Sequence, residues 1–278
     1  MSCGPSVSII IPAYNEERII RRCVSAALEQ TVPADEVIVV DNRSTDGTRA
    51  IVEQLMAERP QGTLRLLRQD TEQGLVPTRN AGLDAATGDI LGRIDADSIL
   101  EPDWVERVVS GFADPEVMGV TGPVHYYDMP LRRLGLKADD SLRRFALRAA
   151  SGRYHFLFGS NMALRASAWA VLRREACRDE DDELHEDIDL SVHMAQRGML
   201  VRYVPELVAG MSARRLDDSP RAYRSYVDRF ERTYRAHSVR EPVLRIPMVI
   251  FLSIYFPAKL IRLLHTAQGA GERSASKG

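Results

Sequence analysis

The sequence of 278 residues has few cysteines, almost no net charge and no very long apolar segment. Its three cysteines are odd in number and lack the spacing of a metal site, which argues against a disulfide framework and favours a reduced, cytoplasmic protein. The net charge of −2 provides no basic surface field, so we predict no nucleic-acid partner. With 45% hydrophobic and 27% charged residues, the composition is that of a globular protein and excludes intrinsic disorder.

No secretory leader precedes the first apolar run, which also favours the cytoplasm. The longest apolar uncharged segment covers residues 246–258 and contains two prolines, and a membrane-spanning helix needs about 17–25 apolar residues. Basic residues flank this segment on both sides. Two interpretations stay open: a helix buried against the protein, or a helix that contacts the cytoplasmic face of a membrane peripherally through residues 243–264. The polar residues 269–278 are predicted to form a disordered tail.

The first 124 residues alternate between β-rich runs and segments with helical spacing of apolar residues. Strands are predicted at 7–11, 37–40, 64–67, 89–94 and 118–124, and helices at 18–29, 48–58, 76–86 and 104–112. This alternation predicts an α/β fold with a mainly parallel sheet that helices cover on both faces. Ligands of such sheets bind at the carboxyl ends of the strands.

Asp95-Ala-Asp97 places two carboxylates one residue apart directly after the apolar strand 90–94. Both side chains can turn toward one cation where the strand ends, and carboxylate oxygens are the ligands that Mg²⁺ or Mn²⁺ prefers. Such a triplet alone often marks a solvated turn. Its place at the ligand edge of the sheet favours a metal site.

The first predicted strand leads into Pro12-Ala-Tyr-Asn-Glu-Glu17. A dinucleotide-dependent oxidoreductase would carry Gly-x-Gly-x-x-Gly at this place. An aromatic ring and a carboxylate instead suit the base and ribose of a nucleotide whose phosphates are held by a metal ion.

Four motifs together resemble those of family 2 glycosyltransferases. They are Ser8-Ile-Ile-Ile-Pro-Ala-Tyr-Asn-Glu-Glu17, Val37-Ile-Val-Val-Asp-Asn-Arg-Ser-Thr-Asp-Gly-Thr48, Thr78-Arg-Asn-Ala-Gly82 and Asp95-Ala-Asp97. Gly159-Ser-Asn-Met-Ala-Leu-Arg165 and His185-Glu-Asp-Ile-Asp-Leu190 resemble the acceptor-side motifs of the same family. The resemblance implies a GT-A fold, which is a Rossmann-like, mainly parallel sheet with helices on both faces. It also implies a nucleotide-diphosphate sugar donor (a UDP-, GDP- or dTDP-sugar), a divalent metal and inversion at the anomeric carbon.

The resemblance also assigns residues to the donor. Pro12, Tyr14, Glu16, Asp41 and Asn42 would hold the base and ribose, Arg79 would approach the diphosphate, Asp95 would contact the ribose or the metal, and Asp97 would bind the metal. The family often has Asp-Asp-Gly where this chain has Asp41-Asn-Arg43, which leaves the identity of the base open. On this reading residues 1–124 form the donor-binding half, 125–210 the acceptor half, and 211–268 a set of C-terminal helices.

Asp187 is the candidate general base that takes the proton from an acceptor hydroxyl. It lies within an acidic stretch, but it begins a predicted helix over 187–197 and it matches the family's base. Glu186 and Asn161 are candidate contacts to the sugar or acceptor. His185, His193 and His237 are candidate third metal ligands.

The sequence reads Ser225-Tyr-Val-Asp-Arg-Phe-Glu-Arg232 where processive members of the family carry Gln-x-x-Arg-Trp, which favours the addition of a single sugar. The predicted acceptor is a glycan, a lipid-linked glycan or a small molecule. Two alternatives stay open: a polyprenyl-phosphate sugar synthase, and a non-catalytic domain that binds nucleotide sugars.

Overall fold

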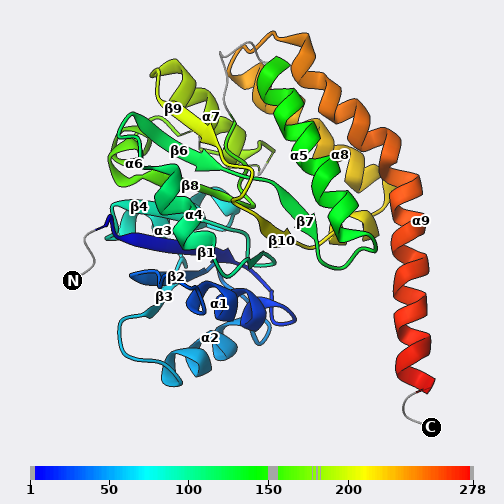
Figure 1. The fold of residues 1–278 in the computed structure, drawn as a ribbon, viewed down its shortest axis with the longest axis horizontal. Coiled ribbons are helices and arrows are strands. Elements are labelled where there is room, and N and C mark those ends of the chain that lie inside the picture. Colours follow the sequence, from blue (N-terminus) through cyan, green and yellow to red (C-terminus); the bar gives the residue numbers. More distant parts are fainter. Residues whose placement is uncertain (1–3, 150–155, 177, 180, 182, 276–278) are drawn as a thin grey trace.

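The β-branched segments form the centre of a seven-stranded sheet with the order β3-β2-β1-β4-β8-β6-β9 (Figure 1). The computed structural model describes residues 4–149, 156–176, 178–179, 181 and 183–275. The strands are β1 (Val7–Ala13), β2 (Glu36–Asp41), β3 (Leu64–Arg68), β4 (Ile90–Arg93), β6 (Val117–Thr121), β8 (Met162–Arg165) and β9 (Leu200–Tyr203). Strand β8 runs antiparallel to β4 and β6, and the other pairs are parallel. The predicted α/β fold with a mainly parallel sheet is therefore confirmed.

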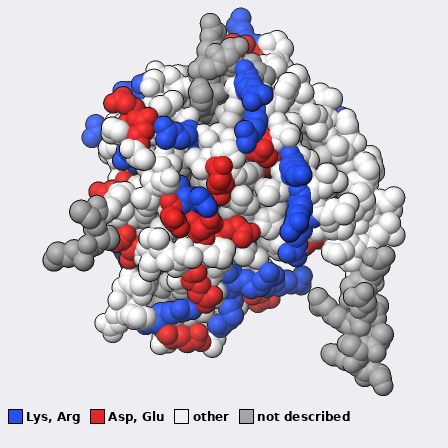
Figure 2. Space-filling view, viewed as in Figure 1, with Lys and Arg blue, Asp and Glu red and all other residues white. Residues whose placement is uncertain are grey.

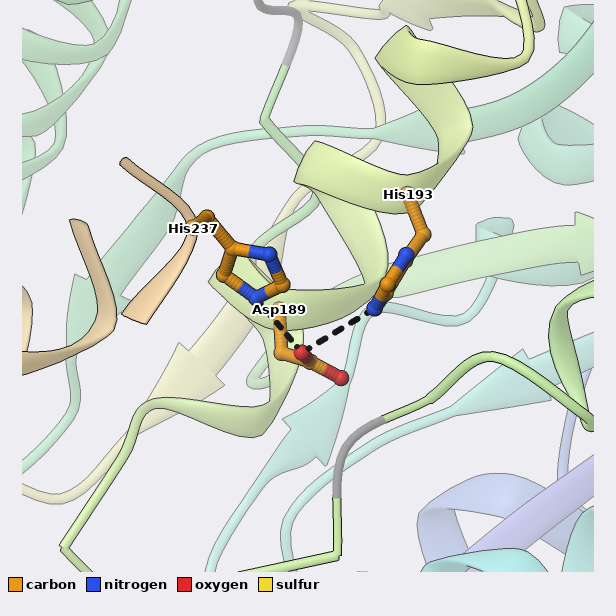
Figure 3. A group of neighbouring side chains, drawn as sticks. All are labelled: Asp189, His193 and His237. Carbon is orange, nitrogen blue, oxygen red and sulfur yellow. Dashed lines mark hydrogen bonds and ion pairs between the residues drawn. The ribbon is translucent and has the colours of Figure 1, made fainter. Parts of the chain in front are cut away.

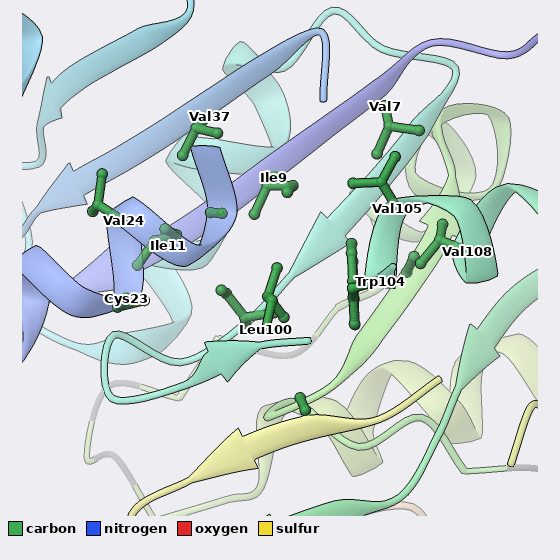
Figure 4. Packing of buried hydrophobic residues seen from close by; sticks show 14 of the residues in the cluster. Val7, Ile9, Ile11, Cys23, Val24, Val37, Leu100, Trp104, Val105 and Val108 are labelled. Carbon is green, nitrogen blue, oxygen red and sulfur yellow. The ribbon is translucent and has the colours of Figure 1, made fainter. Parts of the chain in front are cut away.

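Helices cover both faces of this sheet, and each face has its own apolar cluster. They are α1 (Ile20–Leu28), α2 (Thr48–Ala57), α3 (Leu75–Ala85), α4 (Trp104–Gly111), α6 (Ala166–Leu172) and α7 (Glu186–Gln196). One cluster joins β1 and β2 to α1, α2 and α4, and Figure 4 shows part of it, with Ile9 of β1, Val24 of α1 and Trp104 of α4. The other cluster joins Ile10 and the opposite side of β2 to α3, α6 and α7. Burial on both faces explains why β2 is a continuous apolar run.

A second sheet of three short strands adjoins the first and was not predicted. It has the order β5-β10-β7, with β5 (Ile99–Leu100), β10 (Ala209–Met211) and β7 (Val124–Tyr126). Strands of two or three residues are too short to show a periodic pattern. Strand β10 pairs with β5, which directly follows the Asp95-Ala-Asp97 turn, so the chain after Met211 is brought to that turn.

Three long helices form a layer beside the sheets (Figure 1): α5 (Arg132–Ala149), α8 (Pro220–Ala236) and α9 (Ile246–Ala275). The one-turn 3₁₀ helices Arg214–Asp217 and Pro242–Arg245 precede α8 and α9. Helix α9 extends through most of the tail that we predicted to be disordered, and residues 276–278 lie outside the described part of the chain. Residues 269–275 include two glycines, which disfavour a helix, together with alanine, glutamate and arginine, which propagate a helix that has already begun.

Among the described residues, one helical stretch, Pro242–Ala267, is long and apolar enough to cross a membrane by length and composition. This stretch is longer than the uncharged segment of the sequence and includes Lys259 and Arg262. Both of these side chains turn toward the protein. The Lys259 ammonium donates to the carbonyl of Asp218 at 2.6 Å, and the Arg262 guanidinium donates to Asp217 at 2.8 Å. Only 17% of its most apolar window is buried.

Candidate active site

A cavity of about 580 Å³ lies where the strands of the main sheet end. The residues of the sequence prediction that line it are Pro12, Tyr14, Glu16, Asn42, Asp95, Asp97, His185, Glu186 and Asp187. They come from the ends of β1, β2 and β4 and from the start of α7, which are far apart in the sequence. Figure 2 shows acidic side chains gathered in the middle of one face of the molecule, with a band of Lys and Arg side chains to one side.

Asp95 and Asp97 follow β4 and contribute the cavity's most acidic point. Asp97 is 6% exposed, and burial together with repulsion from Asp95 raises its pKa to about 7. The Arg214 guanidinium lies 2.9 Å from the Asp97 carboxylate and makes two further contacts, of 2.6 and 2.7 Å, to Glu16. Two carboxylates that repel each other in a buried site offer the hard oxygen ligands that Mg²⁺ or Mn²⁺ requires, so the donor set fits a divalent cation.

Arg93 joins the two carboxylate centres of the cavity. Its guanidinium is 2.9 Å from Asp95 and 2.8 Å from Glu186, and the side chain is almost completely buried. Gly159 packs directly against it, and a Cβ at position 159 would overlap the guanidinium. The sequence analysis missed Arg93 because it lies inside an apolar strand. An arginine inside a buried strand needs a carboxylate partner. The presence of Arg93 in an apolar run could therefore have indicated a buried ion pair.

Asp187 and Glu186 are adjacent carboxyls whose pKa values are shifted in opposite directions. Burial and the neighbouring Glu186 raise the pKa of Asp187 to about 6. Burial alone would also raise the pKa of Glu186, but Arg93 and Arg79 more than offset it and lower that pKa. The Asp187 carboxylate accepts hydrogen bonds from the backbone N–H of Gly159 (2.7 Å) and of Ile188 (2.8 Å). Two carboxyls with separated pKa values are a common arrangement for acid–base chemistry.

Residues 8–180, more than half of the chain, match the sequence family described as Glycosyl transferase family 2. The chain belongs to glycosyltransferase family 2. The family resemblance drawn from the motifs is thereby confirmed. Among curated relatives, glycosyltransferase AglE of Haloferax volcanii is 40% identical over 124 residues, which are 44% of this chain and 40% of AglE. Chondroitin synthase of Pasteurella multocida is 39% identical over 108 residues, which are 39% of this chain and 11% of the synthase.

Solved structures confirm the GT-A fold of this family 2 chain. The mannosyltransferase PcManGT of Pyrobaculum calidifontis, in complex with GDP-Man and Mn²⁺, superposes with a TM-score of 0.65 at 23% identity, over 99% of this chain and 76% of that one. Glucosyl-3-phosphoglycerate synthase of Mycobacterium tuberculosis, in complex with Mn²⁺, UDP-glucose and phosphoglyceric acid, superposes with a TM-score of 0.54 at 19% identity. That match covers 83% of this chain and 80% of the other.

Two predicted donor residues of the family motifs lie outside the cavity lining. Asp41 is fully buried, and its carboxylate is 2.8 Å from the guanidinium of Arg49. Arg79, also buried, donates to the side chain of Asn80 and, at 2.9 Å, to the backbone carbonyl of Glu186. Arg79 therefore connects α3 to the start of α7, and it is not among the residues that line the cavity.

Asn42 lines the cavity, but its amide group is already engaged with the protein. Its Nδ2 donates to the carbonyls of Gln69 and Glu72, both at 2.8 Å, and its Oδ1 accepts from the N–H of Gly74. These bonds hold the loop over 69–74 against the end of β2. Asn42 thus shapes the wall of the cavity through this loop, and its amide is not directed at a nucleotide base.

The structure also places Asn161 away from the cavity, against the expectation that it contacts sugar or acceptor. Its Oδ1 accepts from the indole N–H of Trp104 at 2.8 Å, and its Nδ2 donates to the carbonyls of Pro123 and Leu207. The side chain is fully buried. Its neighbour Ser160, in the turn that precedes β8, lines the cavity instead.

Replacement of Asn161 by leucine is therefore expected to destabilise the fold. Each buried partner left without a hydrogen bond costs about 1–3 kcal/mol, and Asn161 serves Trp104, Pro123 and Leu207. Denaturant unfolding should show a lower midpoint at an unchanged slope. Replacement of Ser160 by alanine is the matched control and should unfold like the unsubstituted protein. An Asn161→Leu variant of full stability that binds donor poorly would restore the ligand-contact interpretation.

Several cavity residues come from the C-terminal part and were not predicted as ligand contacts: Arg214, Arg215, Tyr226 and Arg229. The Arg215 guanidinium lies 4.8 Å from the centre of the Tyr226 ring. The His185 ring packs edge-on against the same Tyr226, and burial lowers the pKa of His185 to about 4. The sequence over 219–237 is rich in Arg and Tyr, but it does not show which of these side chains face the cavity. Of the three candidate third metal ligands, His185 lines the cavity, and neither His193 nor His237 does.

Proposed function

We propose that this protein is a metal-dependent, inverting glycosyltransferase that moves one sugar from a nucleotide-diphosphate sugar to an acceptor hydroxyl. The observation that carries the proposal is the shared cavity of Asp95, Asp97 and Asp187, in which Arg93 bridges Asp95 to the neighbour of Asp187. The cavity thus combines an acidic metal-binding end with a carboxyl whose pKa, about 6, suits a base at neutral pH. The two structural neighbours were both solved with Mn²⁺ and a nucleotide sugar, which supports this assignment.

The roles of the residues follow from their positions. Asp97 and Asp95 would hold the cation, which neutralises charge on the leaving diphosphate. Asp187 takes the proton of the acceptor hydroxyl. At the same time the hydroxyl oxygen bonds to the anomeric carbon, and the bond from that carbon to the diphosphate breaks. Each carboxylate oxygen can accept two hydrogen bonds, so the bonds from Gly159 and Ile188 leave room for the hydroxyl. Arg79 and Arg93 hold Glu186 and thereby the start of α7 that carries Asp187.

The raised pKa of Asp187 favours a hydroxyl acceptor over a polyprenyl phosphate, the principal alternative. A phosphate oxygen is already ionised at neutral pH and needs no base, whereas a hydroxyl does. The non-catalytic alternative gives no reason for a buried carboxyl of raised pKa opposite the acidic pair.

The test is a panel of UDP-, GDP- and dTDP-sugars, scored by thermal shift with Mn²⁺ or Mg²⁺ and then by product formation. A donor that binds the native state raises the melting temperature, and a chelator should remove that rise. Radiolabelled sugar in an aqueous product supports a hydroxyl acceptor. Label that is extracted into a lipid phase, and whose transfer is inhibited by competing free phosphate, supports a polyprenyl phosphate acceptor. Donor binding without transfer or hydrolysis would establish the non-catalytic alternative.

We further propose that α9 contacts the cytoplasmic face of a membrane peripherally. Val249, Phe256, Leu260 and Leu263 recur at helical spacing on α9, and each is more than half exposed. The cations expected to face lipid are instead paired within the protein. Lys259 and Arg262 contact Asp218 and Asp217, as described above, and Arg245 is 2.7 Å from Glu231. The contact is therefore mainly apolar.

The start of α5 adds a basic edge to this surface. Helix α5 packs against α9, and Leu131 and Leu134 are 72% and 61% exposed on either side of the exposed Arg132 and Arg133. Apolar side chains between arginines suit the interface of an anionic bilayer.

Replacement of Phe256 and Leu260 by aspartate is expected to abolish binding to vesicles of phosphatidylglycerol and phosphatidylcholine. Burial of one such side chain contributes about 1.5–3 kcal/mol, so the partition coefficient should fall by more than about tenfold. Co-sedimentation measures it, and Val171→Asp, an exposed apolar position on α6, is the matched control. Unsubstituted protein that stays in the supernatant would contradict the proposal. Unsubstituted protein that remains on the vesicles through a carbonate wash would show that α9 spans the bilayer.

A further inference from the structure

A second group of metal-binding side chains lies between α7 and the end of α8. It consists of Asp189, His193 and His237 (Figure 3), and none of the three lines the cavity. Asp189 and His193 are four residues apart on α7 and so share one face of that helix. His237 follows the last turn of α8. The three side chains thus come from two helices that the sequence separates by more than twenty residues.

The donor atoms of this group are already close enough to surround one ion. The Nε2 atoms of His237 and His193 lie 2.8 and 3.4 Å from one oxygen of Asp189, and all three donor atoms lie within 4.8 Å of one another. In Figure 3 both imidazoles turn their Nε2 toward that carboxylate. A tetrahedral zinc ion with bonds of about 2.0–2.2 Å needs its ligands roughly 3.3–3.5 Å apart. The 2.8 Å distance must therefore open, and the two imidazole nitrogens, which lie within 4.8 Å of each other, must come to the same range.

The chemistry of the donors selects the metal. Two imidazole nitrogens and one carboxylate oxygen form a ligand set typical of zinc, whereas Mg²⁺ and Ca²⁺ prefer oxygen donors throughout. The side chains of Asp189, His193 and His237 are 3, 14 and 6% exposed, so the ion would be largely shielded from water. We propose that Asp189, His193 and His237 bind a zinc ion at a site distinct from the Asp95 and Asp97 pair.

The place of this zinc site in the fold gives it a structural role. Helix α7 begins with Glu186 and Asp187, and α8 carries Tyr226 and Arg229 into the cavity wall. A hydrogen bond of 2.8 Å from the His185 N–H to the Thr233 hydroxyl already joins the two helices. A zinc ion bound by α7 and by the end of α8 fixes them more firmly, because metal binding to the folded state alone adds its free energy to folding. Asp189 and the two histidines are therefore positioning residues for the cavity wall.

The experiment separates this site from the acidic pair by using the Asp97→Ala background throughout. The protein is stripped with a chelator, dialysed, and titrated with Zn²⁺ and with Co²⁺. We expect one zinc per chain by elemental analysis, a visible Co²⁺ spectrum of the tetrahedral type, and a rise in melting temperature on addition of Zn²⁺. None of these readouts depends on sugar transfer.

Further replacement of His193 by glutamine should lower the zinc affinity by more than about tenfold, since even the loss of an outer partner of a metal ligand has that effect. Replacement of His237 by glutamine should do the same. His125→Gln, at a mostly buried histidine in strand β7 of the second sheet, is the matched control and should leave zinc binding unchanged. If the His237 variant does not fold, the His193 variant decides, because His193 is the more exposed of the two. Absence of zinc binding in the Asp97→Ala background, or equal affinity in the His193→Gln and His125→Gln variants, would overturn the proposal and leave a hydrogen-bonded cluster.

Discussion

Replacement of Asp187 by asparagine is expected to lower the rate of sugar transfer by about 10²–10⁴ while the affinity for donor stays the same. Asparagine keeps the size of the side chain and one acceptor oxygen, but it cannot take a proton. The loss therefore falls on the transition state, whereas the proposed donor contacts lie at other strand ends. Turnover and donor titration, measured on the same preparation, check the two halves of this expectation.

The pH profile adds a second signature to the same substitution. Because the pKa of Asp187 is raised to about 6, the carboxyl is protonated and inactive as a base below that pH. Turnover of the unsubstituted protein at saturating donor and metal should therefore rise as the pH increases through about 6, and the residual rate of the variant should lack this rise. Asp103→Asn, at an exposed ion pair with Arg107 on α4, is the matched control. Near-normal turnover of Asp187→Asn would move the base to another residue, with Glu186 the next candidate.

Replacement of Asp97 by alanine is expected to remove the dependence of donor binding on Mn²⁺. The substitution deletes the more buried of the two carboxylates and leaves Asp95, already paired with Arg93, as the only acid of the turn. The charge stabilisation supplied by a metal ion amounts to several kcal/mol, so donor affinity in the presence of Mn²⁺ should fall by about 100-fold or more. Calorimetric titration with and without Mn²⁺ measures this effect.

Asp103→Ala controls for the loss of a carboxylate elsewhere on the surface and should bind donor with unchanged affinity. Circular dichroism and thermal unfolding establish that the Asp97 variant is folded. Donor affinity that is undiminished and still sensitive to Mn²⁺ would refute the metal role of Asp97.

Local patterns in the sequence predicted five of the seven strands of the main sheet, their alternation with helices and the strand ends that meet at the cavity, but not β8 and β9. The run Glu36–Asp41 and the turn after β4 could be interpreted because adjacent residues carry the whole signal. Arg93 and Arg214 could not be assigned, because their roles depend on carboxylates from distant elements. Asn161 was assigned to the wrong side of its segment, since a polar motif shows that a residue is functional but not which way its side chain points.

The length of α9 and the directions in which Lys259 and Arg262 point could not be predicted for the same reason. Composition identified an apolar segment with basic flanks, but the partners of those cations, Asp217, Asp218 and Glu231, become neighbours only in the folded chain. Pairing across the fold is a tertiary property, and a single sequence carries little information on it.

The contact of Arg214 with Glu16 and Asp97 has a consequence for the order of ligand binding. A cation that binds Asp97 competes with a guanidinium that is already in place, so part of its binding energy is spent on separating an existing ion pair. A diphosphate offers the released guanidinium a new anionic partner. On the proposed function, metal and donor are therefore expected to strengthen each other's binding, and by thermodynamic reciprocity the factor is the same in both directions. The protein without donor should accordingly hold its catalytic metal weakly, and apparent metal affinity should track the concentration of nucleotide sugar.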